Sequence, residues 1–413
     1  MPNGVMTGTG TQADPWIVED GWDFNALRNV TGGDWAELAN DINLSMFANF
    51  APINLSINLN GNGHLIHDFF IQNSGGNTGI FGSMTTLAGA REIRDVRLMG
   101  EVVAQGMGNT NHAGMLLGSL TNNNSSTTMN LSNIQCFGSI SVIATGGTGG
   151  HNQGVGGCFG HIIINGTSST THISNCSFHG TIQYHVAFTG SNTGAVSSTN
   201  SRGVGGIIGV FHRSAGTNSS ISRCITNLNL FIHGGTAASH HGGIIANLRT
   251  GGGSVNINRC VSVMSVQFTN TADLLQTHPM TVAGTIGHVF EGNGGVSLCA
   301  AHSDIIYDPP GEISALNLGG LIGGMNGTGT NTLANSYSVM RLINPNDLPM
   351  PEYLSVRGTG GLATQNITHS NTFFDATVLA EGWSGAVQRN EHGRTTAQLQ
   401  NRAFLETQGW VFA

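Results

Sequence analysis

The phrase GGCFG at residues 156–160 decides the fold, because close variants of it return along the whole chain. The copies are GIFG at 79–82, GMLLG at 114–118, GGIIG at 205–209, GGIIA at 242–246, AGTIG at 283–287, GGLIG at 319–323 and GGLA at 360–363. Their spacing of 35 to 49 residues is typical of a solenoid, in which each repeat buries its apolar face against the next. The function of such a rod is expected on its outside.

A strand-like segment follows each phrase and carries a repeated small or apolar position, here named the slot. The predicted slots, which form a core ladder, are Val96, Cys136, Cys176, Cys224, Cys260, Cys299 and Ser336. The residues three positions earlier are Ile93, Asn133, Ile173, Ile221, Ile257, Val296 and Leu333. Even offsets after the slot share one face of a strand, and odd offsets carry mostly Ser, Thr, Asn, His and Arg. We therefore expect the slot side chains to be buried and the opposite face of the strands to be exposed to solvent.

The segments between the phrases read as short strands. Period-two alternation, β-branched residues and punctuation by Gly and Asn favour strands over helices. Strands that repeat in one direction form a parallel β-helix, and coils about 4.8 Å apart would make a rod about 40 Å long. The predicted fold is an all-β parallel β-helix of about eight coils over residues 56–385, with lateral loop insertions.

Both ends of the chain differ in composition from the middle. Aromatic, acidic and helix-forming residues gather in residues 15–45 and again in residues 395–413. Exposed terminal coils would present unpaired strand edges, so a solenoid needs a cap at each end. We expect an N-terminal cap over residues 1–55 and a C-terminal cap over residues 386–413.

Several stretches resemble the GLUG-motif repeat family. They are GTGTQADPWIVEDGWDFNALRN at 8–29, GDWAELANDINL at 33–44, LNGNGHLIHDFFIQ at 59–72 and the repeated GGIIG-type phrase. The resemblance covers nearly the whole chain, and it implies a right-handed parallel β-helix of the kind found in bacterial surface proteins and phage structural proteins. It implies a fold much more than an activity. The chain departs from the family pattern in its third repeated element, which is stretched by insertions of uneven length.

Composition excludes several functional classes. The sequence contains no lysine, so all 14 basic residues are arginines, which excludes a P-loop and Schiff-base chemistry. The formal net charge is −8, and no basic patch is expected, so nucleic-acid binding is not predicted. No apolar run is long enough to insert into a membrane. No cofactor is expected.

Localisation and assembly are inferred from the start of the chain and from its low charge. The opening MPNGVMTGTG lacks the pattern of a secretory signal, and Met1 favours synthesis in the host cytoplasm. We therefore expect a virion component, with the bacterial cell surface as the alternative. Only 9 % of residues are charged, so packing against other copies costs little desolvation. The expected partners are further copies in a trimer or array, other virion proteins and, in the alternative, host surface glycans.

The six cysteines and 17 histidines are interpreted as structural. Five cysteines occupy slots, where parallel Cβ directions suit a disulfide poorly, and Cys158 is expected in the core as well. Neither CxxC nor HExxH spacing occurs, so no metal site is predicted. Most histidines are expected to be outward polar residues or loop residues.

The best candidate site lies in two acidic insertions. No Asp or Glu occurs between Glu101 and Asp273, so that part of the rod cannot supply the two carboxylates of glycosidic cleavage. Carboxylates return in DIIYDPPGEI at 304–313 and NPNDLPMPEYL at 344–354, which should lie side by side because Cys299 and Ser336 stack. The predicted binding residues are Asp304, Tyr307, Asp308, Glu312, Asp347, Glu352 and Tyr353. Alternatively, these are rigid, soluble loops that shield a lateral edge.

Three functions are consistent with the sequence. The first is a non-enzymatic phage virion structural protein, either a capsid decoration or a fibre or spike subunit, with a β-helical rod. The second is an adhesin that recognises surface glycans through lateral loops. The third is a tailspike-like polysaccharide depolymerase. Binding to host polysaccharide and shortening of that polysaccharide would separate the three.

Overall fold

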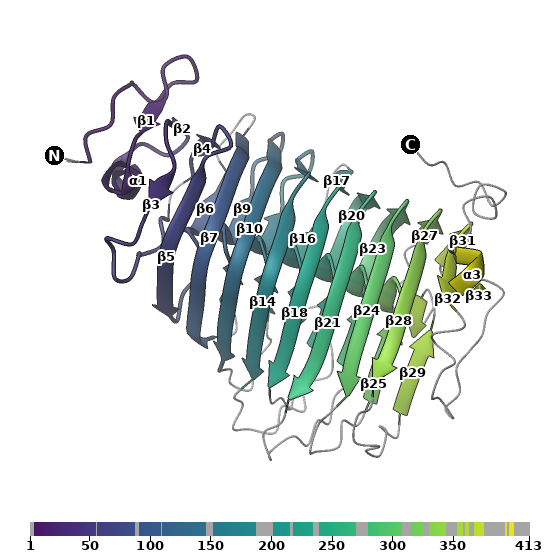
Figure 1. The fold of residues 1–413 in the computed structure, drawn as a ribbon. Coiled ribbons are helices and arrows are strands. Elements are labelled where there is room, and N and C mark those ends of the chain that lie inside the picture. The colour runs from purple at the N-terminus through teal and green to yellow at the C-terminus, as the bar shows by residue number, and fades with distance from the viewer. Residues whose placement is uncertain are drawn as a thin grey trace.

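Successive repeats of the chain lie side by side as rungs of one parallel β-solenoid (Figure 1), which confirms the predicted fold class. The register is regular; for example, Ile182 pairs with Leu230, and Leu230 pairs with Val266. The computed structural model describes residues 4–54, 56–86, 91–108, 110–145, 152–186, 201–214, 218–233, 239–269, 280–307, 315–325, 330–343, 353–357, 360–362, 367–375, 393–394 and 396–399.

One wall of the solenoid is a seven-stranded parallel sheet. Its strands are β8 (Ala113–Gly114), β11 (Asn152–Gly156), β15 (Ser201–Gly205), β19 (Ser239–Gly242), β22 (Met280–Ala283), β25 (Ala315–Gly319) and β29 (Tyr353–Arg357). Among the described residues these strands bound about six complete turns, fewer than the eight predicted. Seven strands enclose six intervals between neighbours, and the first repeat adds no eighth strand in the described part of the chain, where it meets this sheet at a bridge between Thr78 and Ala113.

The remaining walls belong to a sheet with 26 strands in the described part of the chain. The strands that follow the glycine phrases are β6 (Phe81–Thr85), β9 (Leu117–Asn122), β12 (Phe159–Ile164), β16 (Ile208–Arg213), β20 (Ile245–Asn258), β23 (Ile286–Ser297), β26 (Ile322–Met325) and β30 (Gly360–Leu362). The strands that complete the turns are β5 (Leu65–Ser74), β7 (Arg91–Met107), β10 (Thr128–Ala144), β13 (Thr170–Ser174), β14 (Ser177–Val186), β17 (Ser219–Ser222), β18 (Ile225–His233), β21 (Val261–Thr269), β24 (Ala300–Tyr307), β27 (Asn331–Ala334), β28 (Tyr337–Ile343), β31 (Ile367–Ser370) and β32 (Phe373–Asp375).

The second glycine of the repeated phrase sets how closely the turns approach. A Cβ atom placed on Gly157 would lie 2.1 Å from the carbonyl oxygen of Gly206, and one placed on Gly206 would lie 2.1 Å from that of Gly243. Gly243 faces the carbonyl of Gly284 at the same distance. Only a residue without a side chain fits here, which explains why the phrase keeps its form along this part of the rod.

From Asp95 onward, one described non-glycine residue of each turn adopts the left-handed backbone conformation, with φ between 47° and 56°. These residues form what we name the left-handed column, which consists of Asp95, Asn133, Asn175, Arg223, Arg259, Leu298, Asn335 and Asn371. The column breaks the period-two alternation, so that inward residues on its two sides stand three positions apart, as in the buried pair Ile173 and Cys176. This break accounts for the apolar row three positions before each slot.

The column corrects the predicted slot ladder in one turn. The residue after each column member is buried, which gives the observed ladder Val96, Ile134, Cys176, Cys224, Cys260, Cys299, Ser336 and Thr372. Cys136 is also buried, but it lies two residues further along and pairs with Leu98 and Phe178. Four cysteines therefore share the slot, not five. All six cysteines, Cys158 included, are buried free thiols.

The outer face of the large sheet is less polar than the sequence pattern predicts. Ile225, Val261 and Val263 are 48 %, 40 % and 45 % exposed on neighbouring strands β18 and β21. Met99 and Ile343 are also exposed. The expectation of a uniformly polar outer face is wrong because the position after the slot holds aliphatic residues in these turns.

The N-terminal segment covers the first open end of the core. Helix α1 (Gly21–Ala26) begins after Asp20, whose carboxylate accepts hydrogen bonds from two backbone N–H groups of the first turn. Its Phe24 packs against Phe50 and Phe81, with ring centroids 6.0 and 6.4 Å apart. The other elements of this segment are η1 (Leu27–Asn29), β1 (Trp16–Val18), β2 (Trp35–Leu38), β3 (Ile42–Asn43) and β4 (Asn58–Asn60). Since β1, β2 and β4 pair in parallel and lead to β7, the cap also forms the first rungs of the sheet.

Only a small part of the predicted C-terminal cap is described. It comprises β33 (Gly393–Arg394) and the short helix α3 (Thr396–Leu399), while residues 400–413 lie outside the described residues. Within the described residues, no helix combines the length and the apolar character needed to cross a membrane.

Candidate functional site

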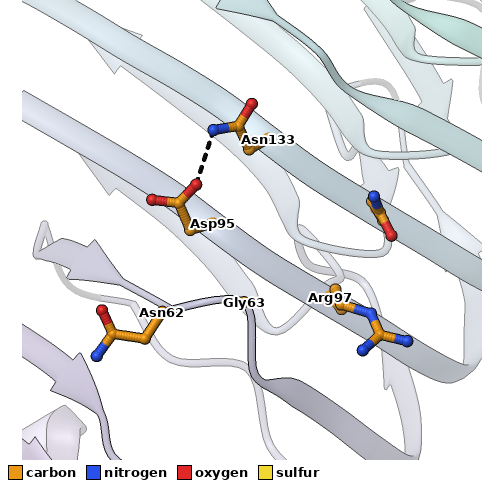
Figure 2. A pocket seen from close by; sticks show the side chains of 6 residues that line it. Asn62, Gly63, Asp95, Arg97 and Asn133 are labelled. Atoms are coloured by element: carbon orange, nitrogen blue, oxygen red, sulfur yellow. Dashed lines mark hydrogen bonds between the residues drawn. The ribbon is translucent and has the colours of Figure 1, made fainter.

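A polar hollow of about 450 Å³ lies at the N-terminal end of the left-handed column (Figure 2). Three neighbouring rungs supply its lining residues, which are Asn62, Gly63, Asp95, Arg97, Asn133 and Gln135. The first two belong to the turn between β4 and β5, the next two to β7 and the last two to β10. A Cβ atom on Gly63 would meet nothing within 4 Å, so the hollow is open at this point.

Side-chain amides stacked along the column fix the acceptors of the hollow. Asn175 donates from Nδ2 to Asn133 Oδ1 at 3.0 Å, and Asn133 donates from Nδ2 to Asp95 Oδ1 at 2.7 Å, as the dashed line in Figure 2 shows. The other carboxylate oxygen of Asp95 accepts from Arg94 Nη1 at 2.7 Å. We name Asp95, Asn133 and Asn175 the amide ladder. Its hydrogen bonds hold each polar group in one orientation before any ligand arrives.

Two further side chains of the hollow supply unused donors. Arg97 and Gln135 pair across β7 and β10 and are both exposed. Neither makes a side-chain hydrogen bond to another described residue, so a guanidinium and an amide remain available. Free donors beside ordered acceptors match a polyhydroxylated ligand, because each hydroxyl group both donates and accepts.

The electrostatics near the hollow favour ionised carboxylates. The pKa of Asp41 is lowered, chiefly because its carboxylate accepts a hydrogen bond from the backbone N–H of Leu65. Its hydrogen bond to His64 and the charge of Arg97 act in the same direction. A neighbouring carboxylate that stays charged at neutral pH is a hydrogen-bond acceptor rather than a general acid.

Asp304, one of the predicted site residues, lies on the outer face of β24 in an ion pair. Arg341, its cross-strand neighbour on β28, donates from Nε to Asp304 Oδ1 at 2.7 Å and from Nη2 to Oδ2. Burial raises the pKa of Asp304, but the hydrogen bond and charge of Arg341, together with His302, outweigh it and hold that pKa below its ordinary value. Asp304 is therefore unsuited to protonate a leaving group at neutral pH.

The other predicted site residues lie at or beyond the ends of the described strands. Tyr307 ends β24 and Tyr353 begins β29, whereas Asp308, Glu312, Asp347 and Glu352 lie outside the described residues. Pairing of Ile306 with Ile343, and of Ala315 with Tyr353, places the stems of the two insertions side by side. A binding role for these residues stays a prediction.

Five histidines in the described part of the chain are buried, as exceptions to the prediction that most histidines take outward or loop positions. They are His112, His161, His240, His241 and His288. The backbone N–H of Gly154 donates to His112 Nδ1 at 3.0 Å, so His112 carries its proton on Nε2 and donates it to His161 Nδ1 at 2.8 Å. Burial lowers the pKa of His112, His241 and His288 to about 3, so these rings are neutral at pH 7.

The positions of these histidines in the sequence indicate that they are buried, whereas the number of histidines in the composition does not. Each lies within two residues of a glycine phrase, where the strands before and after the phrase are buried on both faces over most of their length. Despite their number, no three or more His, Cys, Asp or Glu side chains in the described part of the chain are grouped so that they could hold a metal ion.

Comparison with known proteins gives little beyond the structure itself. No family model and no curated protein sequence matches the chain. A crystal structure from Bacteroides ovatus, provisionally named an immunoglobulin A1 protease, is similar over 86 % of this chain and 86 % of that chain, with 17 % sequence identity and a TM-score of 0.45. The resemblance to the GLUG-motif repeat family stays a prediction.

Proposed function

We propose that the chain is a non-enzymatic attachment rod that binds surface glycans through the polar hollow. The observation that carries this proposal is the combination of an oriented amide ladder with two free donors, Arg97 and Gln135, at one open depression. Sugar hydroxyls can donate to Asp95 and Asn62 and accept from Arg97 and Gln135. A rigid stack of strands suits this task, since the donors and acceptors need not be ordered on binding.

The distribution of carboxylates favours binding over cleavage. Asp95, the carboxylate of the hollow, is held by Asn133 and Arg94, and Asp304 is held by Arg341. Residues 102–272 contain no acidic residue at all. A pair of carboxylates with one protonated member, which glycoside hydrolysis usually needs, is not found along the hollow in the described residues.

The proposed setting is a virion, where the rod would serve as a capsid decoration or as a fibre or spike subunit. The low charge of the chain and the resemblance to GLUG-motif repeat proteins support this setting, and a bacterial cell surface is the alternative. The same low charge supports a homo-oligomer, either a trimer or an array, in contact with other virion proteins.

A glycan-binding assay with size analysis tests the proposal. The purified chain is applied to immobilised neutral and acidic polysaccharides, and the same polymers are examined by size-exclusion chromatography after incubation. We expect binding without shortening, and a loss of at least about tenfold in affinity for Arg97→Ala. Gln183→Ala, at an exposed position of β14 outside the hollow, is the matched control and should bind normally. Absence of binding would refute the proposal, and shortened polymers would favour the depolymerase.

A further inference from the structure

Charge is segregated along the rod. Residues 102–272 carry five arginines and no acidic residue, a formal charge of +5. Residues 1–101 carry four arginines and eleven acidic residues, a charge of −7, and residues 273–413 carry five arginines and eleven acidic residues, a charge of −6. The middle of an acidic protein is therefore cationic, which the net charge of −8 conceals.

Two of the central arginines occupy neighbouring rungs of the left-handed column. Arg223 and Arg259 have φ values of 54° and 55°, and the backbone N–H of Arg223 donates to the carbonyl of Asn258 at 3.0 Å. Both side chains are exposed, and neither forms a hydrogen bond or an ion pair with a described residue. Two like-charged side chains on rungs whose backbones are about 4.8 Å apart repel each other, so an anion bound by both would relieve that repulsion.

Exposed aliphatic side chains adjoin the pair. Ile225 and Val261 each follow their arginine by two residues, and Val263 lies on the same face of β21. The surface thus combines two guanidinium groups with exposed aliphatic side chains on neighbouring strands. A sugar ring carries both kinds of complementary surface, because its C–H groups are apolar and its substituents are polar or charged.

We propose that Arg223 and Arg259 bind the carboxylate or sulfate groups of an acidic glycan that lies along the left-handed column. The inference rests on the proposed function, since it places the same ligand class on the same column. The pair lies two and three rungs from Asn133, about 10 and 14 Å at the strand spacing, so one extended chain reaches both the hollow and the arginines. Guanidinium groups match the geometry of these anions through two parallel hydrogen bonds.

The test compares three polymers, three arginine variants named below and the Arg97→Ala variant of the hollow, all in the whole 413-residue chain. Polygalacturonate is the acidic probe, dextran is the neutral probe, and duplex DNA is a polyanion of another class. The variants are Arg223→Gln with Arg259→Gln, Arg223→Lys with Arg259→Lys, and Arg249→Gln as a control that removes a charge from the same part of the rod but not from the column. Binding is measured by biolayer interferometry at several salt concentrations, after circular dichroism has verified the fold.

We expect the double Gln variant to bind polygalacturonate at least about tenfold more weakly, and the double Lys variant to fall between it and the parent. The Arg249→Gln control should change affinity by less than about threefold. Unchanged affinity in the double Gln variant would overturn the site, and duplex DNA bound as tightly as polygalacturonate would overturn its assignment to glycans. Loss of dextran binding in Arg97→Ala reports on the hollow alone, so failure of the proposed function is distinguished from failure of this inference.

Discussion

The first three rungs of the left-handed column and the next two share a backbone but differ in chemistry. Asp95, Asn133 and Asn175 have φ values of 56°, 54° and 53°, and Arg223 and Arg259 have values of 54° and 55°. The first group is linked by side-chain hydrogen bonds, whereas the second presents two unpaired charges. The stack of strands therefore fixes the conformation of each rung, and the side chain at that rung decides what the surface can bind.

The two groups also differ in what they contribute to stability. Asn and Asp tolerate the left-handed region better than other residues with a side chain, because a short polar side chain can bond locally. Arg gains nothing of this kind, and two arginines on neighbouring rungs repel each other. The middle of the column is therefore the less stable arrangement, which is consistent with a role in binding rather than in folding.

The largest expected effect concerns the core beneath the two groups of column residues, and it tests whether these groups differ only at the surface. Both stand on a core that contains neutral histidines, whose folded pKa values lie below the ordinary value of about 6.5. Their stabilising effect is complete above pH 6.5 and is lost as the pH falls toward 3, because only the unfolded chain takes up the protons. Each of His112, His241 and His288 should lower the unfolding free energy by about 2 kcal/mol between pH 7.5 and pH 5.

Urea unfolding at pH 7.5 and pH 5 measures this loss. A His288→Gln variant should lose less stability on acidification than the parent, by about the share of one histidine. An unfolding free energy that stays constant between the two pH values would contradict the assignment of neutral buried rings.

The second effect tests the boundary between the amide ladder and the arginine pair, which a substitution at Asn175 or Arg223 moves by one rung. Asn175→Arg adds a third arginine beside Arg223 and should strengthen binding to polygalacturonate several-fold, with a steeper dependence on salt. Arg223→Asn extends the amide ladder and should weaken that binding about tenfold, or about 1.4 kcal/mol. Titrations at two salt concentrations check both changes. Equal affinities in the two variants would show that side chains in the column do not control binding.

A third effect separates the backbone of the amide ladder from its hydrogen bonds. Asn133→Gly removes both hydrogen bonds but keeps a residue suited to positive φ, whereas Asn133→Ala also places a Cβ in the left-handed region. We expect the Ala variant to be less stable than the Gly variant by about 1 kcal/mol. Urea unfolding of the two variants gives the difference directly, and a Gly variant that proves the less stable would contradict the assigned conformation.

The smallest effect is expected at Leu298, where the column carries an aliphatic residue. Leu298→Asn should raise the unfolding free energy by about 0.5–1 kcal/mol, because Asn suits φ of 54° better and stands one rung from Asn335. Thermal unfolding provides the measurement. A lower midpoint in the Asn variant would indicate that packing of the Leu298 side chain outweighs its backbone cost.

The sequence predicts the solenoid well because the glycine phrase and the slot repeat together. It misplaces the ladder in one turn because a slip of two residues keeps every side chain on the same face, so Cys136 fits the alternation as well as Ile134 does. The polar Asn133 in an otherwise apolar row is the sign of that slip, and with Leu131 in its place the row becomes wholly apolar.

The candidate site was harder to predict than the fold. Asn62, Asp95 and Asn133 come from three different repeats, and their positive φ values cannot be read from the residue types, since Arg and Leu hold the same conformation elsewhere. The composition favours the acidic insertions instead, because carboxylates are concentrated there. The hollow depends on which side chains meet across rungs, and that follows only from the register.

The stacking of turns also fixes the distance between the hollow and the arginine pair. Repeats of 35 to 49 residues each advance the rod by a single strand spacing, since the strands of successive turns stay paired in register whatever the repeat length. The separation between the hollow and the arginine pair is thus a whole number of strand spacings. Excising one complete repeat between the two sites would shorten that separation by one strand spacing, about 4.8 Å.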